Sequence, residues 1–224
     1  MDKLLSDFRD SIFTDAFNSY GGDIIETGVD SLLGDGLLKD VPVINTIMGV
    51  IKTVLSIRER MFLKNTIVFL SSFNNGTAES DKVDAYKTKL SDDAQASKEM
   101  ERVVLLLNQY VDTIKSRYLA LMYKKYVFGE YDWSKFCELS DILSRLFLED
   151  ILTIKEIYNS ENHTAKYHIL SIPYNVRRLE SIGLVELYGT YARFGDRLLQ
   201  AETMCAELTI NGKILRGIIN TESD

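Results

Sequence analysis

The chain has 224 residues, enough for one large domain or two small ones, and its 46% hydrophobic and 26% charged residues are ordinary for a globular protein. Its two cysteines, Cys137 and Cys205, are isolated, which argues against a disulfide scaffold or a zinc site and favours buried thiols in a reducing compartment. The net charge is −7, and no segment has the basic excess of a chain that lives on nucleic acid, although residues 41–70 carry four bases against one acid.

The first predicted element is a helix over residues 2–17, because apolar side chains recur there at helical spacing until two glycines interrupt the pattern. This start has no basic stretch followed by an apolar core, so it is not a signal peptide, and we predict a cytoplasmic protein. Residues 23–38 are broken by glycines and are expected to form two short helical pieces. The acidic stretch 21–40 is the best candidate for a flexible link.

The stretch 41–57 is the most unusual one, with Lys52 as its only charge and a narrow polar stripe on a very wide apolar face. One interpretation is a helix almost surrounded by protein. The other is a helix that docks into a partner groove or lies on a membrane. In the membrane case the chain is a peripheral protein that inserts residues 41–70. In that case four cations would suit anionic lipid headgroups: Lys52, Arg58, Arg60 and Lys64.

Helices continue through the middle of the chain, where apolar residues keep close to one face of each run. The longest of them would span about 50 Å, so we expect a bend in this central strut of a helical bundle. Glu149 and Asp150 are interpreted as helix-start acids stabilised by the helix dipole. The helices predicted after residue 60 are 61–73, 80–90, 91–128, 132–147 and 149–158.

The pattern changes near the C-terminus, and no strand-like alternation occurs before residue 183. Ser171 and Pro173 are typical of a helix start, with the serine as cap and the proline inside the first turn, and Gly183 is typical of a helix end. The elements predicted here are a helix over 172–182, strands over 184–188 and 204–209, a helical turn over 197–203 in the link between them, and a closing helix over 211–219.

Two short motifs lie in this region, Leu179-Glu-Ser-Ile-Gly-Leu-Val-Glu186 and Leu208-Thr-Ile-Asn-Gly-Lys-Ile-Leu215. Their order, with a wing between them, resembles the winged helix-turn-helix of bacterial transcription regulators over residues 169–219. The resemblance implies that residues 172–182 are a recognition helix. The side chains offered to a partner are then Tyr174, Asn175, Arg177 and Arg178, joined by Arg193 and Arg197 if the fold gathers them.

Upstream, three short stretches resemble uncharacterised bacterial helical proteins, some of them linked to mobile elements, and this resemblance carries no activity. The stretches are Tyr123-Lys-Lys-Tyr126, Gly129-Glu-Tyr-Asp-Trp133 and Leu146-Phe-Leu-Glu-Asp150.

The sequence has no nucleotide-binding glycine motif, no metalloprotease helix and no serine-hydrolase elbow. Its two histidines are too few for a multi-histidine metal site; His168 is interpreted as a packed core residue and His163 as solvated. We therefore expect no enzyme activity, no cofactor, no metal and no small-molecule substrate.

The predicted fold is mainly α, with a helical bundle over residues 1–160 and a small winged-helix-like α+β module over 161–224. The predicted function is a non-catalytic macromolecule-binding protein, such as a regulator, an adaptor or a phage- or defence-associated factor. A protein partner is favoured because the module carries seven bases against eight acids, and the wide apolar face of 41–57 also fits a homo-oligomer. The alternatives are a membrane-active effector that inserts residues 41–70 and a DNA-binding transcriptional regulator.

Overall fold

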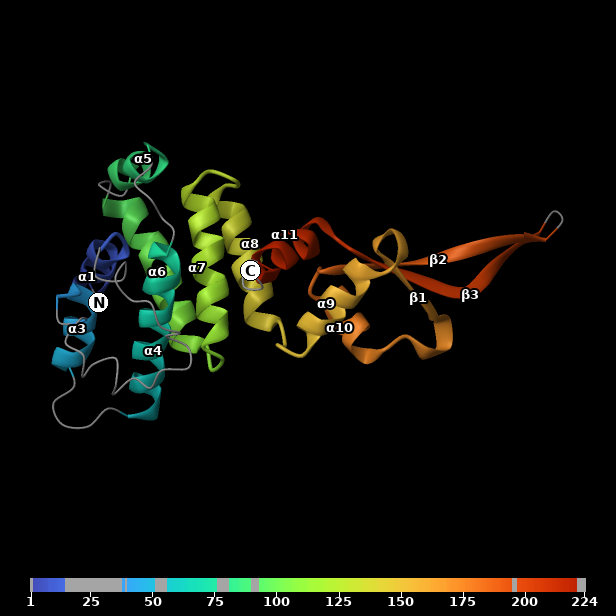
Figure 1. Ribbon diagram of the computed structural model, residues 1–224, viewed down its shortest axis with the longest axis horizontal. Coiled ribbons are helices and arrows are strands. Elements are labelled where there is room, and N and C mark those ends of the chain that lie inside the picture. Colours follow the sequence, from blue (N-terminus) through green and yellow to red (C-terminus); the bar gives the residue numbers. More distant parts are fainter. Residues whose placement is uncertain are drawn as a thin grey trace. The chain divides into compact units, whose positions relative to one another are not determined.

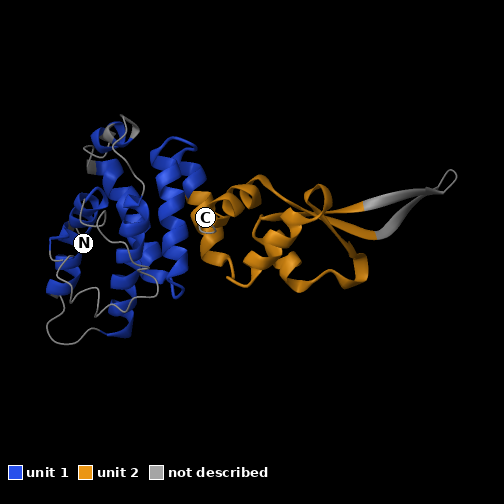
Figure 2. Ribbon diagram, in the orientation of Figure 1, with its two compact units in different colours: residues 1–136 blue, residues 137–224 orange. Residues whose placement is uncertain are grey.

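The computed structural model of the protein describes residues 2–14, 38, 40–50, 56–75, 81–89, 93–194 and 197–220. They form a mainly α-helical chain with a small antiparallel sheet near the C-terminus, which confirms the predicted fold class (Figure 1). The chain divides into two compact units, unit 1 (Met1–Phe136) and unit 2 (Cys137–Asp224) (Figure 2). This division falls inside α8 (Trp133–Arg145), and the boundary at residue 160 remains a prediction.

Unit 1 is built of helices around an apolar core. α4 begins with a capping box, in which the Ser56 N–H donates to Glu59 Oε2 at 2.8 Å and the Glu59 N–H donates to Ser56 Oγ at 3.3 Å. This cap starts α4 at Ile57, ahead of residue 61, where the sequence predicts that the helix begins. The described helices of unit 1 ahead of α8 are α1 (Asp2–Ile12), α3 (Pro42–Val50), α4 (Ile57–Asn74), α5 (Asp81–Lys89), α6 (Asp93–Gln109) and α7 (Ile114–Val127).

The long helix predicted over 91–128 is interrupted between α6 and α7. Asn65 of α4 accounts for the interruption, because its buried Nδ2 donates to the carbonyl oxygens of Leu107 and Tyr110 at 2.9 and 2.8 Å. In an unbroken helix those carbonyls would accept from backbone N–H groups one turn further on. A side chain from a different helix thus replaces the lost backbone bonds, and no proline or glycine marks the place in the sequence.

α3 is covered by protein, with α1 and α4 packed against it. The Val43 N–H donates to Ser11 Oγ of α1 at 3.0 Å. The interpretation of 41–57 as a helix surrounded by protein therefore agrees with its described residues, whereas Lys52 lies outside them. Among the helices that are described, none is both long enough and apolar enough to span a membrane. The buried side chains at the start of this stretch, each at most 6% exposed, are Val41, Val43, Ile44 and Ile47.

Unit 2 carries a three-stranded antiparallel sheet of order β1-β3-β2. A strand does occur before residue 183, where the sequence shows no strand-like alternation: β1 pairs with β3 from Thr164 opposite Glu207 to His168 opposite Thr203. β1 is a short edge strand without a fully buried side chain, so it lacks the apolar alternation that reveals a strand in a sequence. The elements of unit 2 after α8 are α9 (Asp150–Asn159), β1 (Thr164–His168), α10 (Tyr174–Ser181), β2 (Val185–Phe194), β3 (Arg197–Leu208) and α11 (Ile210–Asn220).

The hairpin of β2 and β3 is longer than predicted. Its backbone pairing reaches Phe194 opposite Arg197, so the helical turn expected over 197–203 is wrong. Hydrogen bonds across the hairpin outweigh the weak local helical preference of that stretch. Because β1 pairs with β3 no further than Thr203, the distal part of the hairpin is a two-stranded ribbon.

The two motifs that carry the winged-helix resemblance contact each other. Gly183 ends α10 in the left-handed conformation, with φ +79°, as helix-ending glycines do. Thr209 Oγ1 donates to the Gly183 carbonyl at 2.7 Å, and the Thr209 N–H donates to the Leu184 carbonyl at 3.1 Å. A Cβ on Gly212 would lie 2.2 Å from the Leu184 oxygen, so α11 requires glycine at this approach. The glycines and the threonine of the two motifs therefore have structural roles in the packing of unit 2.

Candidate interaction surface on α10

α10 corresponds to residues 172–182, which the winged-helix resemblance implies are a recognition helix. Its cap residue is Pro173, with φ −59° and ψ 144°, and the helix starts directly after it. The expected cap, Ser171, instead donates its hydroxyl to the His168 carbonyl at 3.4 Å, so this part of the helix-start prediction is wrong. Val176 and Leu179 are fully buried and hold one face of the helix against unit 2.

Arg178 is paired inside its own unit. Its Nε donates to Asp150 Oδ2 at 2.7 Å and its Nη2 donates to Oδ1, a two-pronged pair with the buried first residue of α9. The hydrogen bond to Asp150 raises the pKa of Arg178 above its ordinary value, so the guanidinium stays charged. This pair joins α10 to α9. It also balances the charge of Arg178, which the resemblance implied as a contact residue for a partner.

Two exposed aromatic rings flank the same guanidinium. The Arg178 Cζ lies 4.5 Å from the ring centroid of Phe147 and 5.6 Å from that of Tyr174. Phe147 is 58% exposed and Tyr174 is 80% exposed, and both distances fall in the range of cation–π contacts. Sequence reasoning predicted Tyr174 as a contact residue but placed Phe147 on the apolar face of a helix. Its exposure and its place beside Arg178 are visible only in the tertiary structure.

Asn175 also contacts α9. Its Nδ2 donates to Oγ1 of the buried Thr153 at 2.5 Å, and its Oδ1 accepts from the Val176 N–H at 3.1 Å. Asn175 and Arg178 together therefore tie α10 to α9. Both were predicted as contact residues for a partner, and the structure gives each of them a bond within unit 2 instead.

Arg177 is the predicted cation of α10 that is exposed, and the exposed Glu180 lies one helical turn after it. The exposed side of α10 thus carries one positive and one negative charge. Arg193 and Arg197 lie near the end of the hairpin, in β2 and β3, and their side chains are outside the described part of the structure. We define the α10 face as the exposed side chains of Phe147, Tyr174 and Arg177 with the Arg178 guanidinium between the two rings.

The cations assigned to a membrane surface lie in unit 1. Arg58 and Arg60 are exposed in the first turn of α4, Lys64 is half-buried one turn later, and Lys52 is outside the described residues. Beyond them, α4 is mostly buried from Leu63 to Asn74. The exposed cations are thus confined to one end of a core helix.

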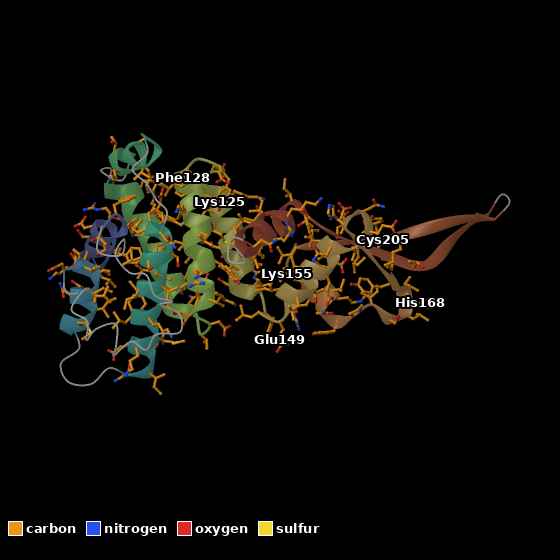
Figure 3. The ribbon with its side chains drawn as sticks, viewed as in Figure 1. Lys125, Phe128, Glu149, Lys155, His168 and Cys205 are labelled. Carbon is orange, nitrogen blue, oxygen red and sulfur yellow. The ribbon has the colours of Figure 1, made fainter. Side chains whose placement is uncertain are left out.

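The histidines and cysteines do not gather. His168 is exposed at the end of β1 (Figure 3) and its Nδ1 accepts from the Leu170 N–H at 3.3 Å, so the interpretation as a packed core histidine is wrong. The His163 ring stacks on Tyr158 with 4.3 Å between centroids. Cys205 is buried in β3, as expected, and Cys137 is half-buried. Within the described ranges no three His, Cys, Asp or Glu residues stand close enough to hold a metal ion.

Comparison of the chain with protein-family models, with curated proteins and with solved structures finds no match. Any function must therefore be argued from the geometry of the residues themselves.

Proposed function

We propose that the chain is a non-catalytic binding protein whose unit 2 contacts a protein partner through the α10 face. The observation that carries the proposal is the position of Arg178, which Asp150 holds between two rings that are largely exposed. Aromatic side chains and arginine are the residues most enriched at the energetic centres of protein interfaces. Because Asp150 and the rings fix the guanidinium in advance, little side-chain entropy is lost when a partner covers it.

The charge on α10 supports a protein rather than DNA as the partner. Phosphate contacts dominate DNA affinity and need several cations on one face. On α10 the charge of Arg178 is balanced by its ion pair with Asp150, and the charge of Arg177 is offset by the nearby Glu180. A surface with exposed rings and little net charge fits a protein interface better.

Membrane insertion of residues 41–70 finds less support. The apolar side chains described at 41–47 and 63–73 belong to the core of unit 1, so insertion would expose that core to solvent or lipid. The apolar side chains left behind in unit 1 would then be exposed to water, at a cost of about 25 cal/mol per Å² of apolar surface.

Photo-crosslinking from position 174 tests the proposal. With a photoreactive amino acid in place of Tyr174, we expect a protein adduct in the host extract that unlabelled wild-type protein competes away. Competition by the Tyr174→Ala variant should be about tenfold weaker, the loss typical of an interface centre. The Ile210→Ala variant is the matched control, since Ile210 is also exposed in unit 2, at 70%, and it should compete like the wild type.

Two results would overturn the proposal. One is equal competition by Tyr174→Ala and Ile210→Ala. The other is saturable binding of mixed-sequence duplex DNA at moderate salt that Arg177→Glu abolishes. Arg178→Glu is unsuitable for the DNA test, because it would set a carboxylate against the buried Asp150 and disrupt unit 2 itself. An adduct with the mass of two copies of the chain would identify the partner as the chain itself.

A further inference from the structure

A second buried carboxylate, Glu99 of α6, lies in unit 1 and accepts hydrogen bonds at both of its oxygens. Tyr126 Oη donates to Oε1 at 2.7 Å, Gln95 Nε2 donates to the same oxygen at 2.9 Å, and Tyr86 Oη donates to Oε2. Glu99 is fully buried, so its charge acts in a medium of low dielectric constant and reaches the neighbouring rings with little screening.

The phenols around Glu99 are held in their neutral, donating form. Burial raises the pKa of Tyr86 and of Tyr123, and the nearby charge of Glu99 raises both further. The hydroxyl groups of Tyr86 and Tyr123 lie 2.5 Å apart, so the network continues from one phenol to the next. Because the single hydroxyl hydrogen of Tyr86 goes to Glu99, the Tyr123 hydroxyl is the donor in the bond to Tyr86.

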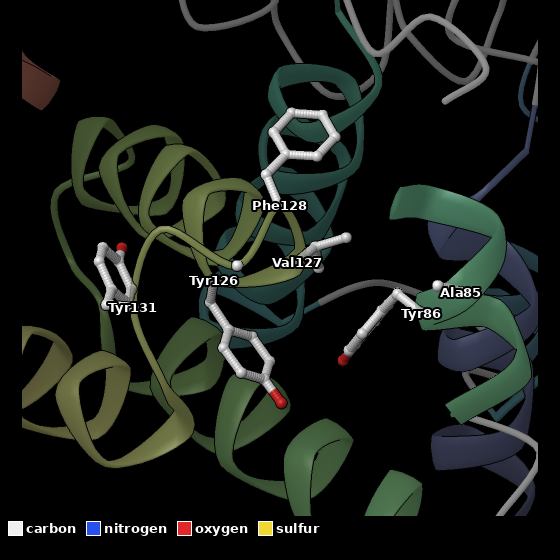
Figure 4. A pocket seen from close by; sticks show the side chains of 7 residues that line it. Ala85, Tyr86, Tyr126, Val127, Phe128 and Tyr131 are labelled. Atoms are coloured by element: carbon white, nitrogen blue, oxygen red, sulfur yellow. The ribbon is translucent and has the colours of Figure 1, made fainter. Parts of the chain in front are cut away.

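Two of the rings that serve Glu99 also line a cavity of about 370 Å³ that opens to the surface of unit 1. Tyr86 reaches it from α5 and Tyr126 from α7, and Figure 4 shows their phenolic oxygens turned to the same side. Phe128 and Tyr131 complete the aromatic part of the lining. Tyr131 Oη donates to the Met122 carbonyl at 2.5 Å, which holds that ring in place.

The cavity has the chemistry of a cation site. Aromatic faces carry a partial negative charge and attract cations, most strongly where water is excluded. Glu99 lies at the phenolic ends of Tyr86 and Tyr126, and its negative charge helps to raise the pKa of Tyr86, after burial and Tyr123. A ring of the lining already has an ammonium near it, since Lys124 Nζ lies 6.0 Å from the Phe128 ring centroid while donating to the Asn75 carbonyl at 2.7 Å.

We propose that this cavity binds a methylated ammonium group against Tyr86, Tyr126 and Tyr131, with Glu99 as the countercharge behind the rings. A mostly aromatic and aliphatic lining offers few acceptors for the three N–H donors of a primary amine. Methylation removes those donors and keeps the charge, so a quaternary or trimethylated ammonium fits the lining best. The group can be carried by a small molecule such as choline or by a trimethyllysine side chain.

Trp133 gives a direct readout, because it is the single tryptophan of the chain and its ring centroid lies 5.4 Å from that of Tyr126. The fluorescence of the full-length protein should change saturably on titration with choline. Neohexyl alcohol, the neutral isostere of choline, should bind roughly tenfold more weakly, because it lacks the cation–π attraction. Equal binding of the two compounds would overturn the proposal, as would the absence of saturable binding by choline.

Two variants test the residues. Glu99→Gln removes the charge at nearly constant shape and should weaken the binding of choline without changing that of neohexyl alcohol. Phe128→Ala removes a half-buried ring of the lining and should weaken both. Tyr174→Ala, in unit 2, is the control and should change neither. If choline binding is the same in Glu99→Gln and Phe128→Ala as in the wild type, with folding verified by circular dichroism, the site is assigned wrongly.

A trimethyllysine peptide distinguishes the two sources of the ammonium group. Tighter binding of that peptide than of choline assigns the site to a methylated protein tail, and the reverse order assigns it to a small molecule. An unmethylated peptide of the same sequence must bind more weakly in either case, or the proposal fails.

Discussion

The two units satisfy their buried carboxylates by different means. In unit 2, Asp150 meets the guanidinium of Arg178, whose flanking rings remain exposed. In unit 1, Glu99 meets the phenols of Tyr86 and Tyr126, which belong to a large buried aromatic cluster. A guanidinium is a donor only, with a fixed planar geometry, whereas a phenolic hydroxyl donates and accepts and can rotate.

The type of donor decides which groups of each unit stay available for binding. The Arg178 pair uses a charge to join two helices and leaves aromatic surface open to a large partner. The Glu99 network uses neutral donors, two of which, Tyr86 and Tyr126, also line the cavity. In our proposals the first carboxylate supports the α10 face and the second supports the cavity of unit 1.

The largest effect is expected from removing a buried ring of unit 1. Phe69 is fully buried, with ring contacts to Phe8, Phe73 and Tyr123. Phe69→Ala should lower the free energy of unfolding by about 3–5 kcal/mol, whereas Tyr174→Ala on the exposed face of unit 2 should change it by less than about 1 kcal/mol. Urea unfolding followed by hydrogen exchange, which resolves the two units, measures both. Similar losses in the two variants would contradict the contrast between buried and exposed rings.

The next effect is the response to alkaline pH. Burial raises the pKa of Tyr86, Tyr123 and Tyr131 in unit 1. Their contribution to stability is fully present below the unfolded-state pKa, near 10, and is lost as the pH rises toward the folded-state values, because only the unfolded chain then releases the protons. The fall should be about 1.4 kcal/mol per pH unit for each tyrosine. In unit 2 the pKa of Tyr167 is raised by its partial burial, so that unit should respond less steeply.

Tyrosinate absorbance and hydrogen exchange across the alkaline range check this expectation. Tyr86→Phe should flatten the slope of unit 1 by one tyrosine, whatever the variant does to stability at neutral pH. An unchanged slope in Tyr86→Phe would show that this phenol ionises freely in the folded state.

The smallest effect compares the two carboxylates themselves. In Asp150→Asn the new amide can no longer accept both bonds from Arg178, and the guanidinium cannot adapt because it has no acceptor. In Glu99→Gln the phenol of Tyr86 can rotate and accept from the new amide. Faster amide exchange should therefore be larger in α9 and α10 of Asp150→Asn than in α6 and α7 of Glu99→Gln. The opposite order would show that the phenols hold their carboxylate more rigidly than arginine does.

The elements with regular apolar spacing could be predicted from the sequence, because their pattern repeats within each element. That is true of α4, α8 and α10 and of the helix end at Gly183. It is less true of β1 and of the break between α6 and α7. Their hydrogen-bond partners lie far away in the chain, on β3 and at Asn65.

The candidate surfaces divide in the same way. Composition and motif order were enough to direct attention to α10 and to its exposed residues Tyr174 and Arg177. Only the tertiary structure decided that Arg178 pairs with Asp150. It also decided that Glu99 accepts from Tyr126, a ring that lines the cavity. The physical reason is that helical spacing shows which side of a helix is apolar. It does not show which charge on another helix will meet a polar side chain, because that depends on how the helices pack.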